Sequence, residues 1–325
     1  MTMLNRIQHG VGAVAIAAAL ALAAWMPTAQ AETLRVGKAA AEAFSFVPAD
    51  VGQQAGIFKK HGLDLAISAF GGGAKLNQAM AAGGVDIALS GGPDMAFVAK
   101  GAPIKGIAAM ADKPLIFTLV VRNDGSVKSV DDLKGGKVGV SGVGSVTNWM
   151  VTEVSRQRGW GVEGITRVAL GNDANRIAAL KTKSIDAALV NITIASKYTQ
   201  AGDGKVLLTF DDLVKDFHIH VIFATNKAIA EKPKALSSFL AGWFETIRFM
   251  RSDRAKTIEI TKKVMKTDDK TTAMIYDAVM PMFNQDGHFK LKALAALARS
   301  YVELKMLPKE PDMKTLYDES FLPKK

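Results

Sequence analysis

Residues 71–90 read GGGAKLNQAMAAGGVDIALS, and residues 171–190 read GNDANRIAALKTKSIDAALV, which repeats the same pattern one hundred positions later. Both stretches predict a turn, then a helix, then a strand of the form V/I-D-x-A-L, and Asp86 in the first matches Asp186 in the second. The shared alanines carry little weight, because alanine-rich helices often match by chance. Self-similarity at a fixed spacing is typical of a duplicated structural unit, so the sequence predicts two similar halves.

The similarity extends upstream of both stretches. Residues 34–37 (LRVG) and 137–140 (KVGV) each predict a short strand, followed by a loop and a helix that ends at a glycine, Gly56 or Gly159. Each half therefore runs strand, loop, helix, strand, turn, helix, strand. Strands that alternate with helices favour right-handed βαβ units, so we expect an α/β fold of two lobes, each a mostly parallel sheet with helices on both faces.

Two apolar segments predict the crossings between these lobes. KPLIFTLVVRND leaves the first lobe near residues 119–121, and HIHVIFATN returns to it near residues 220–223. We therefore expect lobe 1 to comprise residues 32–120 and 222–325, and lobe 2 to comprise residues 121–221. Two crossings make a hinge, and ligands of open α/β sheets lie outside the carboxyl ends of the strands. The prediction is a binding cleft between the lobes.

The first thirty-one residues predict a secretory signal peptide. Arg6 precedes an apolar run over residues 11–25, and Ala29-Gln30-Ala31 supplies the small residues of a cleavage site before Glu32. The alternative, a membrane anchor, is disfavoured because the run is shorter than the roughly 20 residues that span a bilayer. We expect export to the periplasm with cleavage, and no lipid-modified cysteine anchor because the chain contains no cysteine.

The composition excludes several classes of function. Without cysteine, the 325 residues cannot form disulfides, a thiol nucleophile or a cysteine-based metal site. The net charge is +10, but an exported chain without an aromatic-studded basic helix is not expected to bind nucleic acid. No G-x-S-x-G, H-E-x-x-H or phosphate-loop motif occurs, so we predict neither a catalytic residue nor a cofactor.

The loops after the predicted strands supply the candidate site residues. SGVGSVTN at 141–148 is the sharpest, because its glycines let the backbone approach a ligand and the amides of the following helix start favour an anion. The alternative interpretation is helix capping by Ser145 or Thr147. Three glycines over residues 71–73 form a second group of backbone donors, and Asn77, one turn later, points either into the cleft or to solvent.

Further candidates follow the other strands. Phe46 forms either a wall of the cleft or a hydrophobic staple for the next helix. His218 and His220 fall on one face of a predicted strand, as either a weak metal pair or hinge and surface histidines. Lys38, Lys75 and Arg176 are the cations near the cleft loops. The predicted ligand-binding residues are Phe46, Gly73, Asn77, Ser90, Gly91, Asp112, Ser141, Gly144, Ser145, Val146, Thr147, Asn172, Asn191 and His220.

With these segments in place, the chain resembles the substrate-binding proteins of ABC importers, in the nitrate/sulfonate/taurine family that is also called NMT1-like or THI5-like. The resemblance covers nearly all of the mature chain, and five segments carry it. They are VPADVGQQAGIFKKHGLDL from residue 47, GGVDIALSGGPDMAFVAKG from residue 83, SVDDLKGGKVGVSGVGS from residue 129, LKTKSIDAALV from residue 180 and EKPKALSSFLAGWFETIRFM from residue 231.

The resemblance implies a two-lobe Venus-flytrap fold that closes on its ligand and is offered to an inner-membrane permease and its ATPase. It places the ligand loops around Phe46, Gly73, Ser90, Ser145 and Asn191. Two departures matter. No arginine stands at the start of the SGVGS loop, so no strong sulfonate or nitrate clamp is evident there. The yeast pyrimidine synthases of the family use a cysteine-rich iron motif, which a chain without cysteine lacks.

The sequence therefore predicts a monomeric periplasmic receptor for a small anionic organic solute, of the sulfonate, taurine, nitrate, carboxylate or aromatic-acid type. One alternative is a dehydratase-like enzyme of the same fold, against which the signal peptide argues. The other is a ligand-sensing subunit that serves a membrane receptor. The sequence by itself does not separate that subunit from a transport component.

Overall fold

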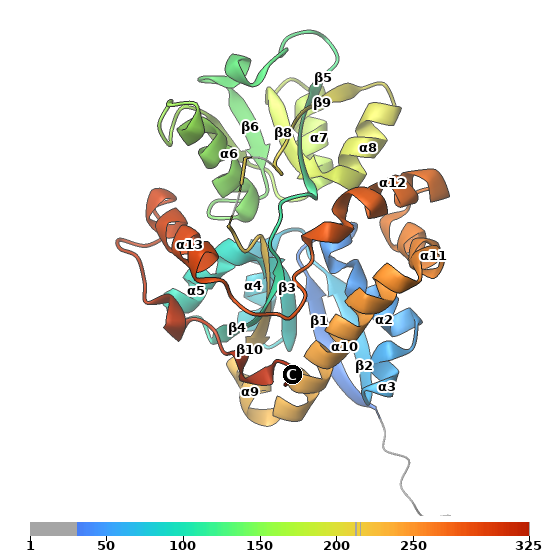
Figure 1. Ribbon diagram of the computed structural model, residues 1–325. Helices are drawn as coiled ribbons and strands as arrows, with labels where there is room; N and C mark the ends of the chain where they lie inside the picture. Colours follow the sequence, from blue (N-terminus) through green and yellow to red (C-terminus); the bar gives the residue numbers. More distant parts are fainter. Residues whose placement is uncertain (1–30, 212, 215, 325) are drawn as a thin grey trace, which may run out of the picture.

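The computed structural model describes residues 31–211, 213–214 and 216–324, so the predicted signal peptide lies outside it except for its last residue. Figure 1 shows two lobes, each built on one five-stranded sheet with helices around it. The α/β two-lobe architecture predicted from the repeat is therefore confirmed. No helix among the described residues has the length and apolar character that a membrane crossing requires.

Lobe 1 contains a sheet of order β2-β1-β3-β10-β4. Its strands are β1 (Glu32–Lys38), β2 (Leu63–Ala69), β3 (Ile87–Gly91), β4 (Ile104–Ala111) and β10 (His220–Thr225). Its first-half helices are α2 (Val47–Gln54), α3 (Ile57–Lys60), α4 (Gly73–Ala81) and α5 (Met95–Ala99), with 3₁₀ turns at Phe44–Phe46 and Gly92–Asp94. The strands β1, β3, β4 and β10 are largely buried, as expected for a sheet that is covered on both faces.

Lobe 2 contains a sheet of order β7-β6-β8-β5-β9, which repeats the plan of lobe 1. Its strands are β5 (Phe117–Arg122), β6 (Lys137–Val140), β7 (Thr166–Ala169), β8 (Ala187–Asn191) and β9 (Gly204–Thr209). Its helices are α6 (Val146–Gln157), α7 (Asp173–Lys181) and α8 (Ile192–Gln200), with a 3₁₀ turn at Val130–Leu133. The predicted strand at 137–140 is confirmed to the residue.

One strand in each sheet runs against the others, and it is the strand that the chain enters from the opposite lobe. β5 is antiparallel to β8 and β9, and β10 is antiparallel to β3 and β4. The lobe boundaries expected at 120/121 and 221/222 therefore fall inside β5 and β10. The chain crosses before each of these strands, because an apolar strand pairs along its whole length with the sheet it joins.

The repeated aspartates explain why the two halves share a motif. Asp86 accepts a hydrogen bond at 3.0 Å from the backbone N–H of Arg35 in β1, and Asp186 accepts one at 2.8 Å from that of Lys137 in β6. Each carboxylate therefore joins the start of β3 or β8 to the neighbouring central strand. Val36 pairs with Ile87 and Val138 with Ala187, so the register is the same in both lobes.

Glycines in the two central strands let a neighbouring side chain approach closely. A Cβ on Gly37 of β1 would lie 2.4 Å from Leu76 of α4, and one on Gly139 of β6 would lie 2.7 Å from Ile185. Both distances are too short for a real contact, so either alanine variant would displace the packing on its sheet. The repeat thus carries a shared packing requirement as well as a shared order of elements.

The C-terminal part of the chain packs on lobe 1 after β10 (Figure 1). It comprises α9 (Asn226–Glu231), α10 (Pro233–Ser252), α11 (Arg254–Met265), α12 (Asp269–Val279) and α13 (Leu291–Glu303), with short 3₁₀ turns at Met280–Met282, Met313–Thr315 and Glu319–Phe321. Proline at the first position of α10 suits a helix start, where its missing N–H is not needed. Trp243 of α10 is fully buried, so this helix belongs to the core of lobe 1.

Candidate functional site

A cavity of about 370 Å³ lies between the lobes, at the carboxyl ends of the parallel strands of both sheets. Loops after β1, β2 and β3 line it from lobe 1, and loops after β6, β7 and β8 line it from lobe 2. Its volume lies in the range of sites for small organic ligands. The cleft expected from the sequence is therefore present, and it lies where the strand order predicts it.

The glycine loops of the repeat meet at the edge of this cavity. Gly71 and Gly171 both line it, and a Cβ on Gly171 would lie 3.8 Å from the carbonyl oxygen of Gly71. The two lobes also bond to each other directly, since Lys197 Nζ of α8 lies 2.7 Å from Glu42 Oε2 and 2.9 Å from the carbonyl oxygen of Met265. The lobes are thus in contact across the cleft.

An aromatic group forms one wall of the cavity. The ring of His220 lies edge-on to Phe46 with centroids 5.1 Å apart, and it stacks on Phe117 at 5.8 Å. Phe46 thus lies in the cleft wall, the first of the two alternatives left open by the sequence. Burial lowers the pKa of His220 to about 3, so its imidazole is neutral at physiological pH. Its Nδ1 is buried and has no hydrogen-bond partner among the described residues.

A buried carboxylate faces the cavity from lobe 1. Asp94 is 4% exposed, lines the cavity and accepts a short hydrogen bond from the hydroxyl of Ser90. Burial raises the pKa of Asp94 to about 6, and the hydroxyl of Ser90 and the neighbouring amide of Asn77 offset this only in part. Asp94 makes no ion pair within the described part of the chain, so its charge has no cationic neighbour.

A buried guanidinium faces the cavity from lobe 2. Arg176 is 3% exposed, and its Nη2 pairs with Asp173 Oδ1. The Asp173 carboxylate also accepts from Asn191, at 3.2 Å from the backbone N–H and 2.7 Å from the side-chain amide. Nε and Nη1 of Arg176 are buried without a partner among the described residues. Of the three cations named from the sequence, only Arg176 lines the cavity, since Lys38 pairs with Asp50 and Lys75 lies outside.

The SGVGS loop is a helix start whose hydroxyls bond one another. Ser145 is the N-cap of α6, where its Oγ accepts from the N–H of Asn148 at 3.2 Å and donates to the carbonyl of Gly142 at 2.8 Å. Thr147 Oγ1 accepts from the N–H of Ser141 and lies 2.9 Å from the hydroxyls of both Ser141 and Ser145. Capping by Ser145, the alternative left open by the sequence, is therefore what the structure shows.

We expect Ser145→Ala to lower the free energy of unfolding by about 1 kcal/mol, because it removes the acceptor for a helix-start N–H. Ser145→Gly is the matched control, since glycine at an N-cap costs only a few tenths of a kcal/mol. Urea denaturation of the two variants measures the difference. A Ser145→Ala variant that is as stable as the wild type would show that the cap contributes nothing.

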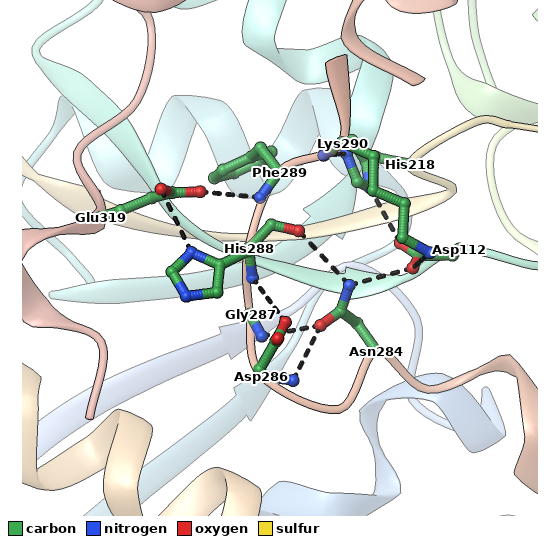
Figure 2. A network of polar contacts seen from close by, with 9 residues as sticks. All are labelled: Asp112, His218, Asn284, Asp286, Gly287, His288, Phe289, Lys290 and Glu319. Carbon is green, nitrogen blue, oxygen red and sulfur yellow. Dashed lines mark hydrogen bonds and ion pairs between the residues drawn. The ribbon is translucent and has the colours of Figure 1, made fainter. Parts of the chain in front are cut away.

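Asp112 does not line the cavity and belongs instead to a polar network at the hinge (Figure 2). Its carboxylate lies 2.9 Å from His218 Nδ1, 2.9 Å from Asn284 Nδ2 and 2.7 Å from Lys290 Nζ. These bonds, together with the positive charge nearby, hold the pKa of Asp112 below its ordinary value despite burial. The residue follows β4 as the sequence suggested, but the C-terminal segment covers it.

His218 belongs to the same network, so the two histidines do not face a common site. Its Nε2 accepts from the backbone N–H of Lys290 at 2.9 Å, which leaves Nδ1 as the donor to Asp112. His218 precedes β10, whereas His220 opens that strand and faces the cavity. No group of three or more His, Asp or Glu residues within the described ranges could hold a metal ion.

The predicted site residues thus divide into two sets. The first set, Asn77, Asp112 and Gly144, does not line the cavity. The side-chain amide of Asn77 is buried next to Asp94. Met306 covers Gly144, since a Cβ on Gly144 would lie 2.7 Å from the Met306 sulfur. The residues that do line it are Phe46, Gly73, Ser90, Gly91, Ser141, Ser145, Val146, Thr147, Asn172, Asn191 and His220. Their role in ligand binding stays a prediction.

Several lining residues are absent from the predicted site, among them Asp94, Asp173 and Phe117. Asp94 follows a Gly-Gly-Pro turn and reads as a helix-start acid, and Asp173 reads in the same way at the start of α7. Phe117 lies in a strand whose pattern gives no sign that its first residue reaches the cleft. The signal available for Asp94 was its place three residues after a strand that ends at the cleft.

Comparison with known proteins agrees with this geometry. The family model described as NMT1/THI5 like matches residues 43–255. A Brucella abortus protein named "Putative binding protein" is 27% identical over 221 residues, which are 67% of each chain. A Saccharomyces cerevisiae 4-amino-5-hydroxymethyl-2-methylpyrimidine phosphate synthase is 29% identical over 126 residues, 38% of this chain and 36% of the yeast one.

The fold is shared with solved periplasmic proteins. The alkanesulfonate-binding protein SsuA of Xanthomonas axonopodis, bound to MOPS, superposes with a TM-score of 0.75. The match covers 88% of this chain and 98% of that one at 19% identity, a level at which likeness shows the fold and leaves the ligand open.

Proposed function

The chain belongs to the NMT1/THI5-like family, and from this membership we propose that it is the solute-binding component of an ABC importer, capturing a small organic molecule between its lobes. Supporting the proposal, solved proteins of the same fold include a ligand-binding component of an ABC-type import system and periplasmic sulfonate-binding proteins. Export through the N-terminal segment, a periplasmic location, and transfer of the solute to a membrane permease and its ATPase belong to the same proposal.

The observation that carries the proposal is a cavity lined by buried polar groups that lack partners. Arg176 Nε and Nη1 and His220 Nδ1 are buried without hydrogen bonds among the described residues. A buried polar group without a partner is costly, so such groups are expected where a ligand supplies the missing bonds. They lie on both sides of the cleft, which favours a ligand held by both lobes.

The connections between the lobes favour capture by hinge closure. Within the residues that the structure describes, the chain crosses between the sheets twice, before β5 and before β10. Away from these crossings the lobes touch through polar contacts, such as those of Lys197 with Glu42 and of Gln200 with Thr271 at 3.0 Å, and through apolar ones, such as Met306 against Gly144. Exposed or half-exposed ion pairs of this kind contribute little by themselves, so a bound ligand can decide the balance between open and closed forms.

The arrangement of the cleft argues against catalysis. The hydroxyls of Ser141, Ser145 and Thr147 bond one another and neighbouring backbone groups, and none of these bonds goes to a base. A nucleophilic hydroxyl needs a base such as histidine within hydrogen-bond distance. We propose a binding role without turnover, although the yeast relatives are named as synthases.

We expect ligand to shorten the distance between the helices that begin at the two glycine loops. Gln78 of α4 and Ala178 of α7 occupy equivalent, exposed positions of the repeat, and a chain without cysteine can be labelled there specifically after substitution by cysteine. Native mass spectrometry identifies the molecule that co-purifies. Pulsed electron resonance on the spin-labelled pair then compares the protein as purified with protein unfolded and refolded without that molecule.

A pair within lobe 1, at Lys60 and Gln78, is the control and is expected to keep one distance in both samples. The proposal fails if no small molecule co-purifies and a small-molecule extract of the source cells leaves the interlobe distance and the melting temperature unchanged. If the protein instead converts the bound molecule into a product over time, the enzyme hypothesis is favoured over the transport hypothesis.

A further inference from the structure

We propose that the solute is a bipolar aromatic molecule, with a protonated nitrogen that binds Asp94 in lobe 1 and an anionic group that binds Arg176 in lobe 2. This inference rests on the proposed function and names the class of its ligand. It narrows the small anionic organic solute expected from the sequence to a molecule whose two ends engage opposite lobes.

The acidic end of the cleft calls for a cationic or N–H donor group. Asp94 is 4% exposed, lines the cavity and is bonded by the Ser90 hydroxyl, with no cation within ion-pair distance in the described part of the chain. Gly73 leaves the carboxylate open, since a Cβ there would lie 2.7 Å from Asp94 Oδ2. A buried carboxylate without a cation is stabilised when a ligand supplies one.

The basic end of the cleft offers two free donors. Arg176 is 3% exposed and already shares Nη2 with Asp173, so the pair carries no net charge. Its Nε and Nη1 are buried without partners. Guanidinium N–H groups bind the two oxygens of a carboxylate or sulfonate with good geometry, so these atoms suit the anionic end of a ligand.

Another part of the cavity lining is apolar and aromatic. His220, neutral and packed between Phe46 and Phe117, lines the cavity together with Phe70, Ile194 and the small side chains of Ala39–Ala41. Aromatic rings pack edge-on or offset-stacked against one another with a gain beyond the area they bury. A planar ring is therefore the body that this wall fits.

The charges of the cleft disfavour a simple anion. Glu42 is paired with Lys197 and Asp173 with Arg176, so Asp94 is the remaining uncompensated charge among the ionisable groups that line the cavity. A solute that brings only negative charge would place it in a cavity that already holds a buried carboxylate. The hydroxyls that could replace its hydration, on Ser141, Ser145 and Thr147, are already bonded to one another.

The repeat shows that the two ends are specialised. At the spacing of one hundred residues, Arg176 corresponds to Leu76, which is fully buried, and Asp94 corresponds to Ile194, which lines the cavity. The two lobes thus share the same order of strands and helices, but lobe 1 supplies a carboxylate to the cleft and lobe 2 supplies a guanidinium. Such asymmetry would hold a bipolar solute in one orientation.

Calorimetric titration of refolded, ligand-free protein with three compounds tests the inference. They are 4-(aminomethyl)benzoate, which carries both charges, benzylamine, which carries only the cation, and benzoate, which carries only the anion. We expect the first to bind at least tenfold more tightly than benzylamine, and benzoate to bind most weakly. Asp94→Asn should weaken 4-(aminomethyl)benzoate and benzylamine at least tenfold and leave benzoate unchanged or tighter.

Arg176→Lys is the complementary variant, because lysine keeps a cation beside Asp173 but loses the planar pair of donors. It should weaken 4-(aminomethyl)benzoate at least tenfold and leave benzylamine within about twofold. Asp64→Asn, at an exposed acid of lobe 1, is the control and should change none of the three.

Several outcomes would overturn the bipolar class: benzoate as the tightest of the three, binding by none of them at millimolar concentration, or an Asp94→Asn variant that binds benzylamine as well as the wild type. The chemical identity of the molecule that co-purifies is a further test. A molecule without nitrogen, or one without the ultraviolet absorbance of an aromatic ring, contradicts the inference. Closure around such a molecule would leave the proposed function standing, so the two failures are distinguishable.

Discussion

Replacing Gly92 by alanine is expected to lower the free energy of unfolding by about 3 kcal/mol or more. A Cβ on Gly92 would lie 1.9 Å from the carbonyl oxygen of His218 and 3.0 Å from the carbonyl carbon. Both atoms belong to the backbone of the segment that returns from lobe 2 to lobe 1 before β10. In the same segment, the carbonyl oxygen of Ile219 accepts a hydrogen bond from the N–H of Gly92. Backbone cannot rotate away as a side-chain end can, so the crossing or the end of β3 must move.

Gly91→Ala is the matched control for this prediction. The residue is adjacent, has ordinary extended backbone angles, and its added Cβ would meet Val146 at 3.5 Å, an ordinary van der Waals distance. Chemical denaturation should therefore place Gly91→Ala within about 1 kcal/mol of the wild type. Equal stability of the two alanine variants would mean that the crossing yields freely at His218.

Replacing Asp94 by asparagine is expected to raise the stability of the ligand-free protein at pH 7.5 by up to about 3 kcal/mol. The reason is the pKa of Asp94, which burial raises from 3.8 to about 6. A raised carboxylate pKa contributes stability that is fully present below pH 3.8 and is lost as the pH rises through about 6. The wild type is therefore destabilised at neutral pH by a charge that asparagine does not carry.

The pH profile of the difference identifies the group. Between wild type and Asp94→Asn, the gap in unfolding free energy should be near zero at pH 4 and should grow up to about pH 7. His220 acts in the opposite sense, because its pKa, lowered to about 3, contributes stability that is lost as the pH falls below 6.5. Since His220 is present in both proteins, subtraction removes its effect.

Urea denaturation of the wild type and of Asp94→Asn at intervals from pH 4 to pH 8 measures this profile. A constant gap between the wild type and Asp94→Asn would contradict the buried, unpaired state of the carboxylate. Greater stability combined with lost affinity for a cationic ligand would show that the charge is kept for binding at the expense of stability.

The fold was predictable because its signals are local and repeated. The order of strands and helices, the glycine ends of the helices and the V/I-D-x-A-L motif depend on neighbours within a few residues. Asp86 and Asp186 show that the repeated motif has the same consequence in both halves, since each directly precedes its strand and accepts from a backbone N–H of the neighbouring strand, β1 or β6. The lobe boundaries were less accurate, because β5 and β10 look alike whichever sheet they join.

The candidate site was predictable by region and less so by residue. Loops after strands lie at the cleft by topology, and most of the predicted residues do line it. Ser145 and Asn172 line it as helix caps, with their oxygens accepting from Asn148 and Asn175. Asp112 does not line the cavity, because its carboxylate bonds His218 and Lys290, which lie more than one hundred residues later in the sequence.

The sequence by itself determined the two-lobe α/β plan, the place of the cleft and the absence of cysteine chemistry, because these follow from composition and from patterns of short range. Only the tertiary structure decided which polar groups remain available to a ligand. Asp94 and Asp173 look like ordinary charged residues of helix starts in the sequence, and Arg176 is only one of three candidate cations. Their roles depend on which side chains lie within hydrogen-bond distance of them. Those side chains come from segments that are distant in the sequence and are brought together only by the tertiary fold.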